Sequence, residues 1–221
     1  MRKRHALHVA RWLAPATVAL LAMSALAAKD VGKVASLRGG VLERQDGSAW
    51  KPLVAGQKVK TGERLRTDKG AVAVIDFPGV GRFVIGPASE IELGREPKDF
   101  TSKMNRGALW MQAKLPAGGR AAVSTPLAVA GVRGTAFSMV FGEGEKAVCA
   151  CTCEGKVEVT TPSGAKLDVP KGEYVAITGG EPAPAKAQPS APVLAQNGTV
   201  FDFCQNCHVA GGKGELKPNW Q

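Results

Sequence analysis

The sequence predicts an all-β fold, a single domain of many short, mostly antiparallel strands arranged as a sandwich or a barrel. Short runs that alternate apolar and polar residues recur between turn signals such as Asp46-Gly47 and Pro78-Gly79, and this spacing is typical of such folds. No stretch after the N-terminal segment has a convincing helical period. A short β-solenoid is the architectural alternative, because glycines and valines at this spacing can also mark the coils of a β-helix.

The first 27 residues are predicted to be a signal peptide. Arg2, Lys3, Arg4 and Arg11 form a basic start without acids, an apolar run follows, and Ala25-Leu26-Ala27 ends it. This order is typical of secretory signals, and we expect cleavage after Ala27 and export to the periplasm. An uncleaved anchor is the alternative, since the apolar run is near the short limit for crossing a bilayer.

Residues 28–178 are predicted to form the β domain, which is large enough to bury a core without disulfides. The pattern within it predicts strands over Val34–Leu42, Trp50–Val54, Ala71–Phe77, Arg82–Ile85, Glu90–Leu93, Ala108–Leu115, Ala121–Val129, Thr135–Phe141, Ala147–Cys153, Lys156–Thr160, Lys166–Val169 and Tyr174–Thr178.

The stretch 121–141, AAVSTPLAVAGVRGTAFSMVF, is the most informative part of the chain. Phe137, Met139 and Phe141 alternate with smaller residues, as in a strand with one buried face. Thr125-Pro126 is expected to start a new extended segment. Gly131 and Gly134 flank Val132-Arg133, where the backbone is expected to need conformations that only glycine adopts cheaply.

The string TP-x-A-x-A-x-VRGT-x-F in this stretch resembles the signature of the FecR domain, the periplasmic sensing module of iron-uptake regulators. Upstream, a G-x-x-V-x-x-G-x-x-L-x-T segment and a G-P-x-S turn extend the resemblance over about Gly32 to Ile177. The resemblance implies a module that binds another envelope protein, such as the signalling region of an outer-membrane receptor. Partner contacts are expected around Arg133 and Thr135, in the turn that runs from Gly131 through Gly134, although these residues can equally be structural.

The chain departs from full regulators of this family, because no cytoplasmic anti-sigma segment precedes its apolar run. We therefore expect a stand-alone sensing or scaffolding module that does not control a sigma factor directly.

The charge of the chain argues against nucleic acid as a partner. The net charge is +10, and the predicted mature form keeps 25 of the 29 basic residues and all 19 acids, a net charge of +6. These basic residues are scattered through turns, whereas nucleic-acid recognition needs a concentrated basic face with aromatic residues.

Residues 179–198 are predicted to be a linker and residues 199–221 a small tail. The linker is rich in proline and alanine and has few large apolar side chains, so it cannot offset its ordering entropy. The tail is too short to fold without a metal, a cofactor or docking to the domain.

The tail contains Cys204-x-x-Cys207-His208, the form of a c-type haem attachment site. Two thiols at this spacing can form thioethers to one porphyrin while the adjacent imidazole ligates the iron. Met104, Met111 and Met139 are the candidate distal ligands. The alternative is a Cys204–Cys207 disulfide without a cofactor.

Cys149, Cys151 and Cys153 alternate along a predicted strand, so they project from one face, too far apart for disulfides between neighbours. They either pack as small core residues or combine with Cys204, Cys207 and His208 in a zinc, copper or iron–sulfur site, since thiolate and imidazole suit these metals. Five cysteines cannot all pair within one chain in an oxidising compartment.

Enzymatic activity is not expected. A serine or cysteine nucleophile needs a base within reach, and His208 is the only histidine of the predicted mature chain. The chain also lacks the G-x-x-x-x-G-K-[ST] motif that cradles phosphates.

Overall fold

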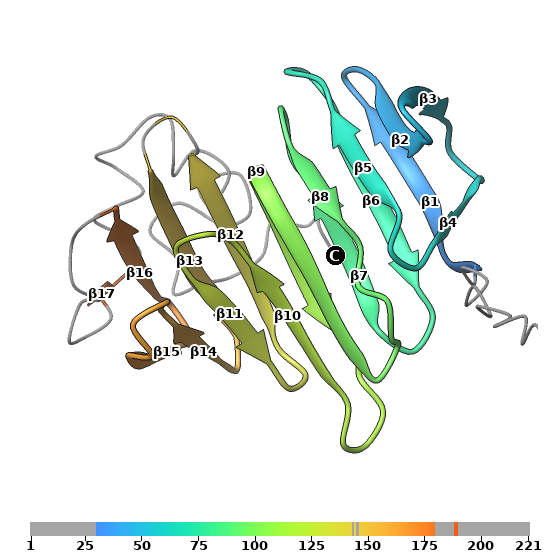
Figure 1. The fold of residues 1–221 in the computed structure, drawn as a ribbon. Coiled ribbons are helices and arrows are strands. Elements are labelled where there is room, and N and C mark those ends of the chain that lie inside the picture. The colour runs from blue at the N-terminus through green and yellow to red at the C-terminus, as the bar shows by residue number, and fades with distance from the viewer. Residues whose placement is uncertain (1–29, 143, 145, 180–187, 190–221) are drawn as a thin grey trace, which may run out of the picture.

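A computed structural model of the chain describes residues 30–142, 144, 146–179 and 188–189, and these residues form strands and turns without a helix (Figure 1). The predicted all-β class is therefore confirmed. Within these ranges no helix is long and apolar enough to cross a membrane. The predicted signal peptide 1–27 and tail 199–221 lie outside the described residues, as does most of the predicted linker.

The described residues form seventeen strands. They are β1 (Asp30–Arg38), β2 (Leu42–Asp46), β3 (Ala49–Leu53), β4 (Lys58–Lys60), β5 (Arg64–Thr67), β6 (Val72–Phe77), β7 (Gly81–Ile85), β8 (Glu90–Glu92), β9 (Asp99–Ala113), β10 (Arg120–Ser124), β11 (Val129–Val132), β12 (Ala136–Gly142), β13 (Ala147–Glu154), β14 (Lys156–Thr160), β15 (Lys166–Pro170), β16 (Glu173–Thr178) and β17 (Gln188–Pro189).

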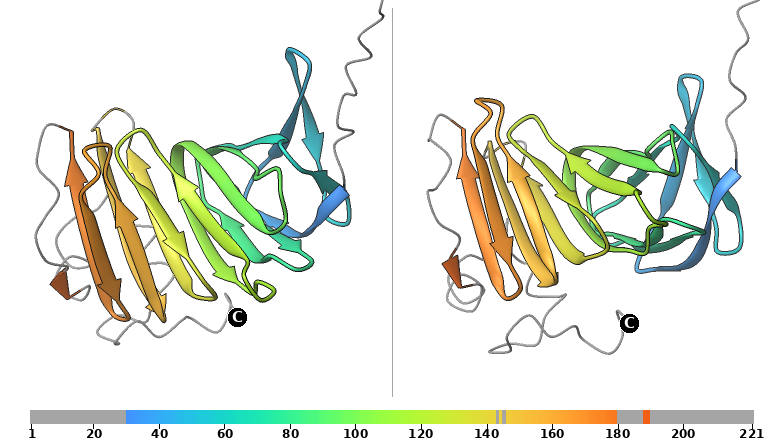
Figure 2. Two further views of the ribbon diagram at one scale, coloured as in Figure 1. Left: turned by 60° about the horizontal axis from the view of Figure 1, so that its bottom comes forward. Right: turned by 90° about the horizontal axis from the view of Figure 1, so that it is seen from below.

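Hydrogen bonds join all these strands into one continuous sheet that folds into two layers. Layer A has the order β4-β1-β6-β7-β9-β12-β13-β16-β17, and layer B has the order β3-β2-β5-β8-β9-β10-β11-β14-β15. Both layers run in nearly the order of the chain, as the colours in Figure 2 show from the β1 end to the β16 end. The predicted sandwich is confirmed, and pairing is antiparallel apart from β9 and β10, unlike the parallel coils of a β-helix.

Strand β9 belongs to both layers. Its first part pairs with β8 and β10 in layer B, and its second part, from Gly107 onward, pairs with β7 and β12 in layer A. The backbone turns between the layers at Gly107, which has a φ of +96°. A side chain at this position would be strained, and its Cβ would lie 2.2 Å from Ser89 Oγ and 2.4 Å from Ser89 Cα.

A buried hydrogen-bond network fixes this crossing. Thr67 Oγ1 donates to the Gly86 carbonyl at 2.6 Å and accepts from the Ser89 N–H at 3.0 Å. Ser89 Oγ donates to the same Gly86 carbonyl at 2.9 Å and accepts from the Ala108 N–H at 2.9 Å. The threonine of L-x-T and the serine of G-P-x-S thus satisfy backbone groups that burial would otherwise leave unpaired.

The core lies between the two layers and is aromatic at its centre. The rings of Phe77, Phe83 and Phe100 pack in a triangle with centroid distances of 4.7, 5.1 and 5.5 Å. Phe77 and Phe83 come from layer A and Phe100 from layer B, so this cluster joins the layers by burial of apolar surface.

Several predicted strand boundaries were wrong. The run Val34–Leu42 divides into β1 and β2 at Gly39, which has a φ of +75°. The run Ala121–Val129 contains a chain reversal between β10 and β11. Strands β4 and β5 were not among the predicted strands, because both are short and rich in basic residues. The first half of β9 was not predicted either, because the polar Ser102 takes an inward position between Phe100 and Met104.

Replacing Gly107 by alanine should destabilise the domain by more than about 2 kcal/mol, because the new Cβ meets the Ser89 backbone and the φ is left-handed. Gly131→Ala is the matched control, since its φ is not left-handed and its Cβ would meet only Glu158 O at 3.8 Å. The control should stay within about 0.5 kcal/mol of the parent in denaturant unfolding followed by circular dichroism. Equal unfolding midpoints for the two variants would contradict the role of this crossing.

Candidate functional site

The signature stretch begins with a turn closed by a threonine side chain. Thr125 Oγ1 accepts from the N–H groups of Leu127 and Ala128 at 3.3 and 3.1 Å, and the Thr125 N–H donates to the Ala128 carbonyl at 2.8 Å. Pro126 lies at the first corner, where its fixed φ suits a turn. Thr125-Pro126 therefore reverses the chain between β10 and β11, which corrects the expectation that it only starts an extended segment.

The four residues predicted as a partner contact or turn divide into two kinds. Gly134 has a φ of +87° and forms the turn between β11 and β12, and Thr135 is buried while its carbonyl accepts from the Ala113 N–H at 2.8 Å. Gly131 lies within β11, and Arg133 is exposed. The prediction that glycine is required is confirmed at Gly134 and wrong at Gly131, which does not have a left-handed φ.

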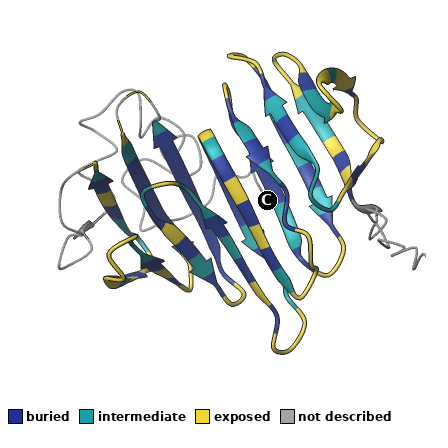
Figure 3. Cartoon of the chain, viewed as in Figure 1, coloured by how far each residue is buried: buried dark blue, intermediate teal, exposed yellow. Residues whose placement is uncertain are grey.

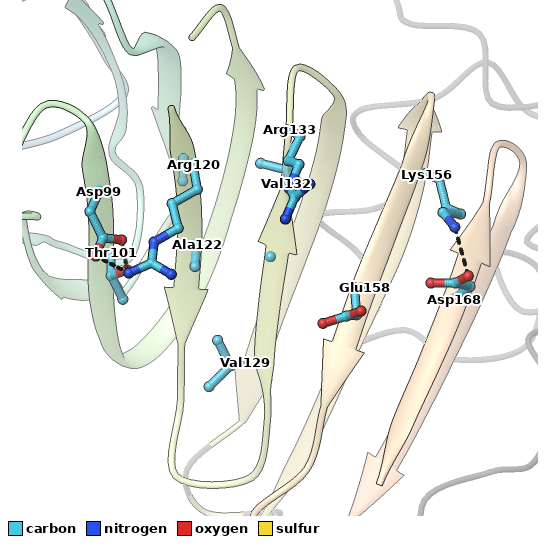
Figure 4. Close-up of a pocket in the computed structure, with 12 residues that line it drawn as sticks. Asp99, Thr101, Arg120, Ala122, Val129, Val132, Arg133, Lys156, Glu158 and Asp168 are labelled. Carbon is cyan, nitrogen blue, oxygen red and sulfur yellow. Dashed lines mark hydrogen bonds and ion pairs between the residues drawn. The ribbon is translucent and has the colours of Figure 1, made fainter. Parts of the chain in front are cut away.

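Gly131 and Arg133 line a hollow of about 670 Å³ on the outer face of layer B, called here the layer B groove (Figure 4). Its floor is low because Ala122 and Gly131 face each other on β10 and β11. Strands with charged side chains lie on both sides of this floor. Asp99 is on β9 at one side, and Glu158 on β14 and Asp168 on β15 are at the other. The groove is lined by Asp99, Thr101, Arg120, Ala121, Ala122, Val129, Gly131, Val132, Arg133, Lys156, Glu158 and Asp168.

Most charges of the groove are paired across strands. Arg120 lies 2.5 Å from Asp99 and Lys156 lies 2.7 Å from Asp168. The Arg120 guanidinium, which donates a hydrogen bond to Asp99, holds the pKa of that carboxyl below its ordinary value. No ion pair joins Arg133 to another described residue, and Arg133 and Arg120 also line a neighbouring hollow of about 650 Å³ beside the β9–β10 loop. Arg133 therefore offers a charge that an incoming group can pair with.

Sequence reasoning missed most of these lining residues. Arg120 and Asp99 meet through the parallel pairing of β9 and β10, which no local pattern indicates. Gly131 was predicted as a partner-contact or turn residue, but its sequence context did not indicate that it forms the floor of a groove.

The second group of predicted site residues lies on the other side of the molecule. Cys149, Cys151 and Cys153 project from one face of β13, as predicted, and this face is the outer face of layer A. They are buried in a second hydrophobic cluster, as the prediction that they pack as small core residues expected, but this cluster is separate from the one between the layers. We call their surroundings the thiol face, which comprises Val84, Ala108, Trp110, Ala136, Ser138, Val140, Cys149, Cys151 and Cys153.

The thiols of this face are in weakly polar surroundings. Cys151 Sγ lies 3.2 Å from Ser138 Oγ. Burial raises the pKa of the Cys153 thiol well above its ordinary value, and the neighbouring Cys151 adds to the rise. Cys153 is therefore protonated at neutral pH and is a poor nucleophile without a metal.

The described residues alone do not complete a metal or haem site. Among them no three His, Cys, Asp or Glu side chains are placed to hold a metal ion. Cys204, Cys207 and His208 lie outside the described residues. Met104, Met111 and Met139, the candidate distal haem ligands, are fully buried between the layers.

Replacing Gly134 by alanine should lower the stability by about 1–2 kcal/mol, from backbone strain alone, since no atom lies within 4 Å of the new Cβ. Arg133→Ala, at the adjacent exposed position, should leave the unfolding midpoint within experimental error. Thermal unfolding of both variants measures the difference. A destabilised Arg133→Ala protein would show that this arginine has a structural role.

Comparison with known proteins supports the sequence resemblance. The family model described as FecR protein matches residues 63–158, a narrower range than Gly32 to Ile177 but one that contains β5 to β13 and the start of β14. No curated protein matches the chain. Two crystal structures of a candidate anti-sigma factor from Parabacteroides distasonis share the fold, with TM-scores of 0.52 and 0.51 and 14% identity over 59% and 60% of this chain. The chain spans 62% and 65% of their lengths.

Proposed function

We propose that residues 63–158, which match the FecR family model, form a signal-sensing module that binds another protein of the cell envelope through the layer B groove. The observation that supports this most is the placement of the signature. Thr125 and Gly134 of the signature form turns. Gly131 and Arg133, in contrast, line an open hollow.

The surface chemistry of the groove suits a segment of polypeptide. Its floor is formed by small residues, Val129 at its side is 38% exposed, and both signs of charge surround it. An extended segment with a small or apolar side chain toward Gly131 and a carboxylate toward Arg133 would fit this arrangement. A nucleic acid would not, because carboxylates occupy the groove beside the basic residues.

The N-terminal sequence supports a periplasmic location for this interaction. The family resemblance makes the signalling region of an outer-membrane receptor the first candidate partner. The proposal covers sensing or scaffolding by this domain.

Photocrosslinking in the periplasm of the native host tests the proposal. The full chain carries benzoylphenylalanine in place of Val129, exposed at the side of the groove, or, as the control, at the exposed position 51 on β3 at the far edge of layer B. We expect an adduct with one envelope protein from position 129 only. Gly131→Val fills the floor without a left-handed φ and should abolish this adduct, and Arg133→Ala should weaken it by about tenfold.

Two results would contradict this function. One is an adduct that forms equally from position 51 or persists in Gly131→Val. The other is the absence of any adduct from position 129.

A second candidate function is a redox or metal protein, and the gathering of three cysteines on the thiol face favours it. Cys204, Cys207 and His208 would hold a c-type haem, which supplies electron transfer when bound, or would join Cys149, Cys151 and Cys153 in a zinc, copper or iron–sulfur site. The body contributes soft thiol donors in an apolar environment, which fits a thiolate-ligated metal better than it fits a distal haem ligand.

Visible absorption and metal content of the protein matured in a host with haem-ligation machinery test this second candidate. We expect a bound chromophore or metal that is lost in Cys204→Ser and in His208→Ala, while the far-ultraviolet circular dichroism is unchanged. A colourless, metal-free parent protein that is folded would exclude the second candidate and leave the sensing function untouched.

A further inference from the structure

The central strands of layer A are buried on both faces. In several strands of both layers, such as β6 and β14, buried residues alternate with more exposed ones. In contrast, every residue from Ala136 to Phe141 on β12 and from Val148 to Cys153 on β13 is buried, as the continuous dark blue of both strands shows in Figure 3. One face of these strands meets the core, so the other face is also covered.

The register of layer A places the buried outer residues side by side. Val84 lies opposite Trp110 on β9, Trp110 lies opposite Ser138 on β12, and Ser138 lies opposite Cys151 on β13. Trp110 and Ser138 are both 0% exposed. A tryptophan on an open sheet face would expose much of its ring to solvent.

The described residues do not account for this cover. All buried members of the thiol face come from strands of layer A itself, and every described strand belongs to one of the two layers. An apolar patch of this kind on an antiparallel sheet is normally packed against another element or a partner.

We propose that the C-terminal segment 199–221 docks on the thiol face. The described chain ends at the right place for this, because Gln188 on β17 pairs with Tyr174 on β16, and Tyr174 pairs with Cys151. Pro189 thus lies at the edge of layer A that is nearer to β13, and 32 residues follow it. The inference is independent of the layer B groove.

The length of the chain allows this docking. Four strand spacings separate β17 from β9, a distance of about 19 Å. Cys204 is 15 residues beyond Pro189, and an extended chain of that length spans about 50 Å. The tail therefore reaches the middle of the thiol face without strain.

The composition of the tail also matches the face. Phe201 and Phe203 alternate in the sequence immediately before Cys204, so that in an extended segment both rings project to one side. Their burial against Trp110 and Val140 would bring Cys204, Cys207 and His208 next to the three thiols of β13. Docking would thus gather all five cysteines and the histidine at one surface, which is the arrangement that the second candidate function requires.

Alkylation of the body cysteines tests the proposal in the full exported protein. After reduction with a phosphine, the reaction of Cys149, Cys151 and Cys153 with N-ethylmaleimide is followed by peptide mass spectrometry. We expect slow labelling in the parent and at least about tenfold faster labelling in Phe201→Ser/Phe203→Ser and, to a smaller extent, in Phe203→Ser. Val54→Ser, at an exposed valine of the body, is the matched control and should label as slowly as the parent.

Three results would overturn the proposal. Fast labelling of the parent would show that the face is open. Slow labelling that survives both tail variants would assign the cover to another segment, such as residues before Asp30. Protection that is lost on dilution would assign it to a second copy of the chain. Unchanged far-ultraviolet circular dichroism of the tail variants establishes that faster labelling does not come from unfolding.

Discussion

The whole architecture depends on the passage of one strand from one layer to the other. At Gly107 the backbone of β9 approaches Ser89 so closely that only a hydrogen atom fits on Cα, and the Ser89 hydroxyl accepts from the next N–H. Thr67 completes the network from β5. These polar groups are buried, and all of them are satisfied together only when β5, the segment between β7 and β8, and β9 are in place. The network therefore makes the crossing specific as well as stable.

Sequence patterns predicted the fold class and the strands that alternate cleanly, such as Ala71–Phe77 and Lys156–Thr160. They failed where a polar residue points inward, as at Ser102, or where a short strand is mostly basic, as in Lys58–Lys60. The layer B groove could not be predicted from the sequence either, because Asp99 and Arg120 come together only through the pairing of β9 with β10. The clustering of Cys149, Cys151 and Cys153 followed from the period of a strand alone, but their covered state did not.

Some residues of the signature stretch stabilise the fold and others shape its surface, and the sequence motif alone does not show which residues do which. Thr125, Gly134 and Thr135 act within the fold, by closing turns and accepting backbone hydrogen bonds. Gly131 and Arg133 act at the surface, since the first leaves room and the second leaves a charge. Residues of the first kind are expected in any chain with this fold, whereas residues of the second kind can change with the partner.

The shared strand also divides the molecule. All described strands before β9 lie on one side of it in both layers and all strands after it lie on the other, so β9 alone is hydrogen-bonded to both halves. The layer B groove and the thiol face lie mainly in β9 and the half that follows it. A structural change at the groove or at the thiol face can pass to the other half through the hydrogen-bonded strands only if the fifteen residues of β9 twist or shift. Strand β9 is therefore the element through which the sheet couples the two ends of the domain.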